Sequence, residues 1–174
     1  PTLVSFAVST ANADKVVSTE FKKAGSTVIQ IRPQYDENGL PVFDSIRECF
    51  DKVEKIIADV RAAAIWAVDF GGVAEGIAKM SFGNRIGFEF AKKLSAAELF
   101  QPCAGAFIIE LIGNAENGEE IIGATTSKKT IAAPDYTLDL EDLIDTWEKK
   151  LEPVFPCRIK TPAEKPEIYT FNRS

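Results

Sequence analysis

The chain has 174 residues, a formal net charge of −6 and no histidine. This length suffices for one domain with a buried core, and the mixture of acidic and basic residues argues against nucleic acid or an anionic membrane surface as a partner. Without histidine the chain cannot hold a Ser-His-Asp triad or a Cys-His pair, so acid–base chemistry would fall to carboxylates, lysine or tyrosine.

The three cysteines, Cys49, Cys103 and Cys157, lie far apart in the sequence. Their spacing fits neither a disulfide framework nor a zinc site. Unpaired thiols are typical of a reducing compartment, so we expect a cytoplasmic protein. The first residue is Pro1 rather than methionine, and we expect a piece of a longer protein.

The N-terminal pattern predicts a β-α-β unit. Residues 3–8 are apolar enough for a strand, residues 13–24 show helical spacing after a cap at Thr10 or Asn12, and residues 27–31 read as a second strand. Such a unit would place its two strands parallel.

A polar loop over residues 33–41 follows, with a turn signal at Asn38–Gly39. Ser45 and Glu48 then form a possible capping box. Apolar residues at helical spacing predict a helix from there to about residue 58, and its charged residues read as a solvated face.

The central stretch predicts a strand, a tight glycine turn and a helix. The apolar run 62–68 indicates a buried strand, and residues 72–80 show helical spacing. Glu75 and Lys79 form an i,i+4 pair on the polar side of this helix. Gly83 is placed to end it in a left-handed conformation.

The glycine pair in this turn has two interpretations. Unpaired N–H groups and the positive end of the helix dipole could bind phosphate or carboxylate, or the glycines could serve only a sharp turn and close packing. The spacing fits neither G-x-G-x-x-G nor a P-loop. Arg85 could reach an anion there or lie exposed on the surface. The candidate phosphate- or nucleotide-binding residues are Asp69, Gly71, Gly72, Val73 and Arg85.

The pattern of the second half of the sequence predicts strands over 86–90 and 104–111, with a short helical turn over 96–99 between them. A hairpin-like turn is expected over 114–120, followed by a polar edge strand or strand pair over 124–133. A last helix is expected from an Asp139 cap to Leu151. Glu110 is expected at the margin of the sheet. Trp147 is interpreted as a packing residue of the last helix. Two prolines end that helix, and residues 156–174 read as a linker.

The stretch FGGVAEGIAKMSFGNRIGFEF resembles the Gly-Gly helix of the C-terminal-type domain in the aminoimidazole ribonucleotide synthetase-like superfamily. It is most similar to phosphoribosylformylglycinamidine synthase in its long single-chain bacterial form. The matching residues are Gly71, Gly72, Ala74, Ala78, Met80, Ser81 and Phe82. The usual aspartate directly before the glycine pair is replaced by Phe70, with Asp69 one position earlier.

The resemblance implies an α/β fold, in which helices flank a mixed sheet of partly ferredoxin-like topology. It implies that residues 1–155 are the second copy of this domain and that residues 156–174 lead to a missing glutaminase domain. Its partners would be the other domains of the same polypeptide and a small-molecule nucleotide.

The parent enzyme would convert formylglycinamide ribonucleotide, ATP and glutamine into formylglycinamidine ribonucleotide, with ATP/ADP and Mg²⁺ bound largely by other domains. The Gly-Gly helix would help close a site for the reacting nucleotide or for a structural one. The isolated chain is expected to retain no cofactor and to be inactive. Two alternatives stay open: an autonomous anion- or nucleotide-binding module, and a domain of another synthetase such as aminoimidazole ribonucleotide synthetase or selenophosphate synthetase.

Overall fold

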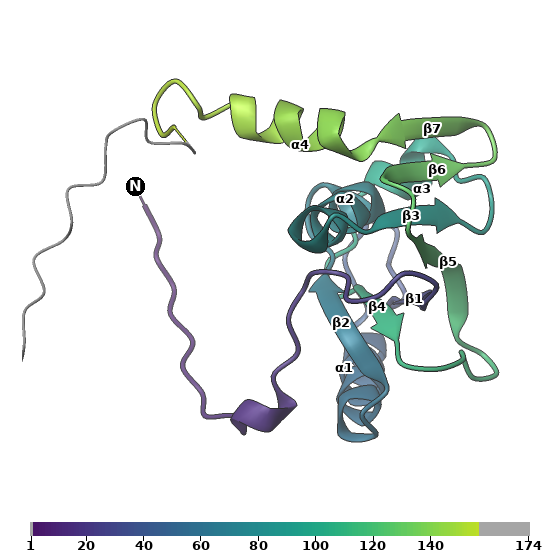
Figure 1. Ribbon diagram of the computed structural model, residues 1–174. Helices are drawn as coiled ribbons and strands as arrows, with labels where there is room; N and C mark the ends of the chain where they lie inside the picture. Colours follow the sequence, from purple (N-terminus) through teal and green to yellow (C-terminus); the bar gives the residue numbers. More distant parts are fainter. Residues whose placement is uncertain (1, 157–174) are drawn as a thin grey trace, which may run out of the picture.

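The computed structural model describes residues 2–156 and shows a mixed seven-stranded sheet flanked by helices (Figure 1). This confirms the predicted α/β class. The strands are β1 (Thr27–Ile31), β2 (Ala62–Ala67), β3 (Gly87–Phe90), β4 (Phe107–Leu111), β5 (Glu120–Thr126), β6 (Thr130–Ala133) and β7 (Tyr136–Asp139). The helices are a 3₁₀ turn η1 (Ala13–Lys15), α1 (Phe43–Ala58), α2 (Gly72–Asn84), α3 (Ala96–Phe100) and α4 (Leu140–Lys149).

The strand order is β2-β4-β1-β5-β3-β6-β7. All neighbours pair antiparallel except β3 and β6, which are parallel. The turn at Asn117–Gly118 exists, with Gly118 at a φ of 89°, but β4 and β5 do not form a hairpin because β1 lies between them. The stretch 124–133, predicted as a polar edge strand or strand pair, contributes the end of β5 and all of β6. These two strands do not pair, because β3 lies between them, and neither lies at an edge of the sheet.

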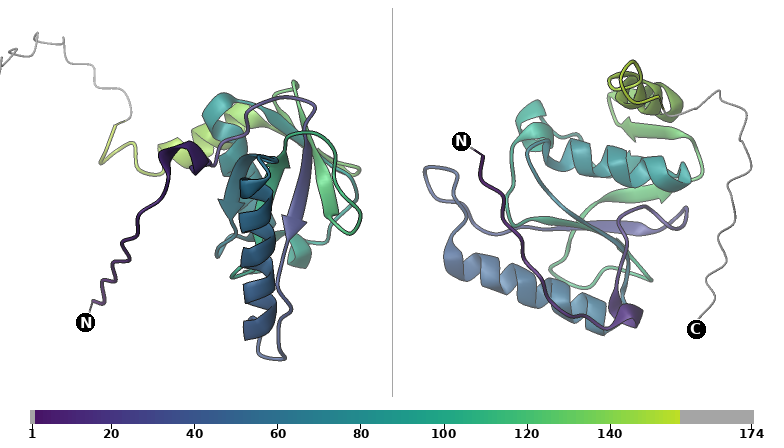
Figure 2. Two further views of the ribbon diagram at one scale, coloured as in Figure 1. Left: turned by 90° about the horizontal axis from the view of Figure 1, so that it is seen from below. Right: turned by 90° about the vertical axis from the view of Figure 1, so that its left-hand side faces the viewer.

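Helices cover both faces of the sheet, and Figure 2 shows α1 and α2 on opposite sides of it. Alternating residues of a strand point to opposite faces. Ile29 and Ile109 accordingly join the core under α1, whereas Val28 and Ile108 join the larger core with Ile77 of α2.

The predicted strand over 3–8 and helix over 13–24 are both wrong. Residues 2–12 are extended but unpaired, and only η1 is helical. Tertiary contacts of residues 21–23 explain the difference. Phe21 is fully buried, and its N–H donates to the Met80 carbonyl at 2.9 Å. Because this segment bonds to α2 and the sheet instead of to itself, there is no β-α-β unit, although β1 lies where it was predicted.

Glu110 is fully buried within β4 rather than lying at a margin of the sheet. Its carboxylate accepts hydrogen bonds from the backbone N–H groups of Lys22 at 2.7 Å and Lys23 at 3.1 Å. A buried carboxylate needs such partners. Glu110 therefore fixes the segment before β1 to β4, next to the edge strand β2.

The helix termini correct two further predictions. α1 begins at Phe43, before the predicted capping box, and Ser45 instead accepts the Gln34 N–H at 2.9 Å. α2 continues through Gly83, and Arg85 takes the left-handed conformation with a φ of 52°.

The predicted cap of α4 is confirmed, because the Asp139 carboxylate accepts the N–H groups of Glu141 and Asp142. Trp147 on α4 packs against Phe82, with 5.8 Å between the ring centroids. Most of the predicted linker, residues 157–174, lies outside the described residues.

Candidate functional site

The glycine turn connects β2, near one edge of the sheet, to α2. Gly72 has a φ of 65°, a backbone conformation that favours glycine, and its N–H donates to the Asp69 carbonyl at 3.0 Å. Gly71, Gly72, Val73 and Asp69 therefore lie together at the amide end of α2, as the sequence predicted for an anion site.

The short helix α3 closes directly over Gly72. A Cβ atom on Gly72 would lie 2.5 Å from the Leu99 carbonyl oxygen and 2.8 Å from that of Gln101. These atoms belong to the backbone and cannot rotate away. The packing interpretation of Gly72 thus has a direct geometric basis, and Val73 beside it is also buried.

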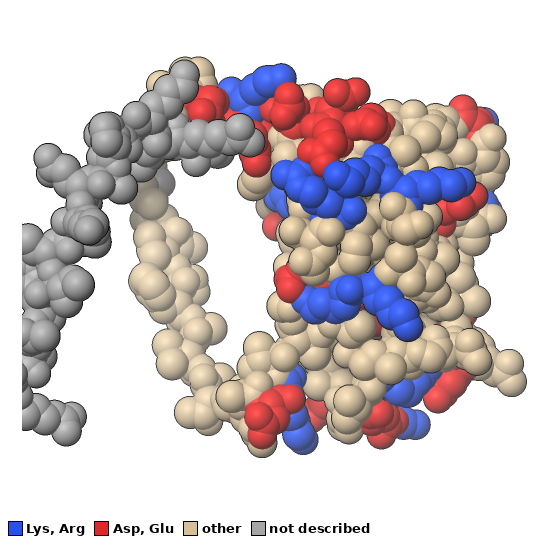
Figure 3. Space-filling view, viewed as in Figure 1, with Lys and Arg blue, Asp and Glu red and all other residues tan. Residues whose placement is uncertain are grey.

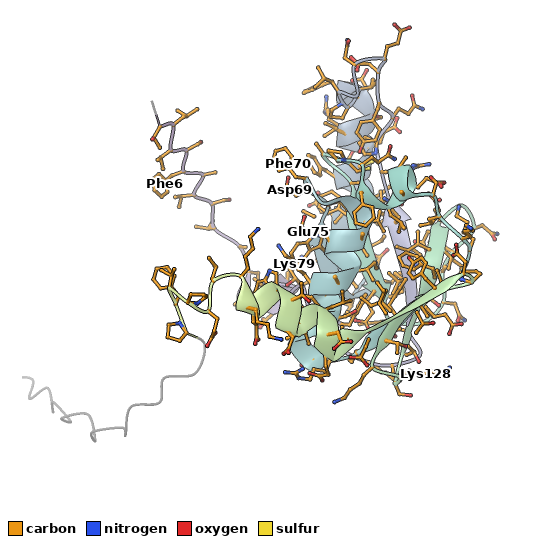
Figure 4. The ribbon with its side chains drawn as sticks, turned by 90° about the horizontal axis from the view of Figure 1, so that it is seen from above. Phe6, Asp69, Phe70, Glu75, Lys79 and Lys128 are labelled. Carbon is orange, nitrogen blue, oxygen red and sulfur yellow. The ribbon has the colours of Figure 1, made fainter. Side chains whose placement is uncertain are left out.

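The first amide of this turn already has an anionic partner. Gly71 N–H donates to Glu75 Oε2 at 3.0 Å, and Lys79 Nζ lies 2.6 Å from Glu75 Oε1. The Lys79 ammonium, followed by the Gly71 amide, holds the pKa of the Glu75 carboxyl below its ordinary value. The predicted Glu75–Lys79 pair is confirmed, and any external anion at Gly71 would compete with Glu75 (Figure 4).

Arg85 lies apart from this turn. It follows the last residue of α2, and the helical rise over 13 residues places it about 20 Å from Gly72. There it forms an ion pair with Glu141 of α4, which Lys129 also approaches. Figure 3 shows the acidic residues gathered above a band of Lys and Arg. Arg85 could not contact an anion bound at Gly71 in this structure.

An apolar groove of about 810 Å³ opens beside the amide end of α2. Its lining comes from six elements and the turn before α2, and includes Phe70, Phe90, Phe100, Ile131, Leu138 and Leu143. Among the described residues that line it, Glu75 is the only charged one. Phe70 is 83% exposed and Phe100 61% exposed. The sequence did not predict this groove. Its one local signal was Phe70, at a position where the similar family carries aspartate.

Among residues 2–156, no three His, Cys, Asp or Glu side chains lie close enough to hold a metal ion. Asp69 is the carboxylate of the turn itself, and Glu75 is engaged by Lys79. The residues present therefore do not fit a self-contained Mg²⁺ site. The described part of the chain also contains no helix that is long and apolar enough to cross a membrane.

No protein-family model matches the chain. Several solved structures are similar to it, and three of them serve as examples. Phosphoribosylformylglycinamidine synthase II from Thermotoga maritima has a TM-score of 0.59 at 8% identity, over 93% of this chain and 31% of that chain. T. maritima PurL complexed with AMPPCP has a TM-score of 0.62 at 8% identity, over 92% and 31%. A HypE–HypF complex has a TM-score of 0.51 at 19% identity, over 71% and 54%.

At these identities the likeness shows the fold alone. The chain has the mixed α/β fold that these proteins share, the fold of aminoimidazole ribonucleotide synthetase-like domains. It spans about a third of the length of the PurL chains that it matches.

Proposed function

We propose that this chain is a domain of an ATP-dependent ligase of the phosphoribosylformylglycinamidine synthase type, active in purine biosynthesis with glutamine as amido donor. Within that enzyme it corresponds to the second C-terminal-type domain. Residues 1–155 form the domain, and residues 156–174 lead toward a glutaminase domain in the cytoplasmic parent.

The observation that carries this proposal is the fold likeness to PurL, which extends over more than nine-tenths of this chain but only a third of PurL. Such a ratio is expected when one domain of a multidomain enzyme is compared with the whole. One of the similar structures contains AMPPCP and another contains ATP. A nucleotide is therefore the ligand class to test first.

The amide end of α2 is the place where this chain would contribute to a phosphate site. The helix dipole and the Gly71 amide favour a negative charge there, as the bound Glu75 carboxylate illustrates. A phosphate would replace that carboxylate, take over the Gly71 N–H and gain Lys79 as a counter-ion. We propose Gly71, Gly72, Val73 and Asp69 as the contact residues; Arg85 would need a rearrangement to join them.

The experiment is an NMR titration of the labelled chain with phosphate, ADP and formylglycinamide ribonucleotide, each with and without Mg²⁺. We expect shifts centred on Gly71 and Gly72. Glu75→Gln removes the competing charge and should tighten phosphate binding several-fold. Glu54→Gln, an exposed change on α1, is the matched control and should leave the affinity unchanged.

Millimolar ADP that leaves the Gly71 and Gly72 amides unmoved, in the wild type and in Glu75→Gln, would overturn the binding role of this turn. An ATPase assay tests the expected inactivity of the isolated chain. Turnover above background would contradict it and favour a complete enzyme instead.

A further inference from the structure

The N-terminal arm, residues 2–12, exposes large apolar side chains to water. Leu3, Val4, Phe6 and Val8 are between 66% and 95% exposed. No hydrogen bond joins residues 2–11 to any other described residue, and Figures 1 and 3 show the arm standing clear of the rest of the molecule. Its composition is that of a strand, and none of its side chains is charged.

The arm starts from the β2 edge of the sheet. Asp14 and Lys15 of η1 lie close to the start of β2, and the Ser18 carbonyl accepts the outward N–H of Ile65 in β2 at 3.2 Å. Ser18 thereby occupies the point where another strand would pair with β2. The arm therefore cannot pair with β2 at this position.

The opposite edge, β7, is open. The register of β6 and β7 turns the backbone N–H and C=O of Thr137 outward, and no described residue bonds to them. The side chains of Tyr136 and Leu138 in the same strand line the apolar groove. An extended apolar peptide at this edge would thus gain backbone partners and a place to bury its side chains.

The arm cannot place Val8 at β7 of its own chain. Six strand spacings separate β2 from β7, about 29 Å. From Val8 to Ala13, the first residue of η1, the chain takes five residue steps, which span at most about 18 Å. Figure 4 shows Phe6 and the groove residue Phe70 well separated within one molecule.

We propose that the groove and the β7 edge accept the N-terminal arm of a second copy of this chain. Val4, Phe6 and Val8 alternate onto one face of an extended strand and would enter the groove. The arm and the groove match chemically. Residues 2–12 carry no charged side chain, and Glu75, the one charged side chain among the described residues of the groove, already pairs with Lys79. Since donor and acceptor are different surfaces, each chain offers both.

The first test is light scattering after size exclusion, over a dilution series. We expect a concentration-dependent mass above the 19.0 kDa of one chain. Phe6→Asp in the arm and Leu138→Asp in the groove should each weaken association at least tenfold. Leu40→Asp is the control, since it places the same charge on an exposed leucine in a loop outside both the arm and the groove and should leave association unchanged.

A mixing experiment identifies the contact. Phe6→Asp retains an intact groove and Leu138→Asp retains an intact arm, so an equimolar mixture should associate although neither variant does so alone. A wild type that stays monomeric at millimolar concentration overturns the proposal. Association that survives both substitutions, or a mixture that fails to associate, overturns it equally. Near-ultraviolet circular dichroism checks that both variants remain folded.

Discussion

The helices cover the two faces of the sheet to different extents. On one face, Cys49, Val53 and Ile56 of α1 form a closed core with residues of β1 and β4. The start of α1 requires neither a glycine nor a capping side chain. On the other face, α2 begins at a crowded glycine turn, and α2, α3 and α4 leave an apolar groove open between them. An apolar surface that the chain leaves exposed in this way is typical of an interaction site. Function is therefore to be sought on the α2 face.

The largest expected effect is at the start of α2. Gly72→Ala should cost about 4 kcal/mol of unfolding free energy, because it combines a left-handed backbone with overlap against the α3 carbonyls. Gly118→Ala is the matched control: its φ is also positive, at 89°, but no atom lies within 4 Å of the added Cβ. It should cost about 1 kcal/mol in the same urea denaturation experiment. Equal losses would show that conformation alone, and not packing against α3, requires Gly72.

A second pair of substitutions compares the two faces directly. Ile56→Ala removes buried apolar volume under α1 and should cost about 3 kcal/mol. Phe100→Ala truncates a larger side chain, but one that is 61% exposed at the groove, and should cost less than about 1 kcal/mol. Denaturation of dilute protein measures both. A large loss for Phe100→Ala would mean that the groove side is part of the folded core rather than a free surface.

The local pattern of the sequence predicted most elements of both faces. β1, β2, β4, α1, α2 and α4 lie where the apolar pattern indicated them, because each helix buries a regular stripe of its own residues and each of these strands is a short, mainly apolar run. The pairing of β1 between β4 and β5 could not be predicted in this way, since a turn such as Asn117–Gly118 is local whereas strand insertion is not.

For the candidate site, too, the sequence predicted the local features but not the contacts between distant residues. Asp69, Gly71 and Gly72 are neighbours in the chain and were brought together as predicted, but Arg85 was separated from them by the length of a helix. The groove was not predictable because six elements and the adjoining turn contribute to its lining. The helix predicted over 13–24 failed for a related reason: Phe21 is held by α2 and the next two amides by Glu110, both distant in sequence.

The smallest expected effect concerns the carboxylate that occupies the amide end of α2. Because Lys79 lowers the pKa of Glu75 in the fold, the ionised pair stabilises the protein above the ordinary carboxyl pKa of 4.5, and this contribution is lost as the pH falls through the lowered value. In a double-mutant cycle of Glu75→Gln and Lys79→Met we expect a coupling of about 0.5 kcal/mol at pH 7, which is small because both side chains are partly exposed. The coupling should fall toward zero as the pH is lowered through the titration of Glu75, measured by urea denaturation at pH 7 and at a series of acidic pH values. A coupling that does not change with pH would contradict the ionic origin of this contact, and with it the competition between Glu75 and an external phosphate for the Gly71 amide.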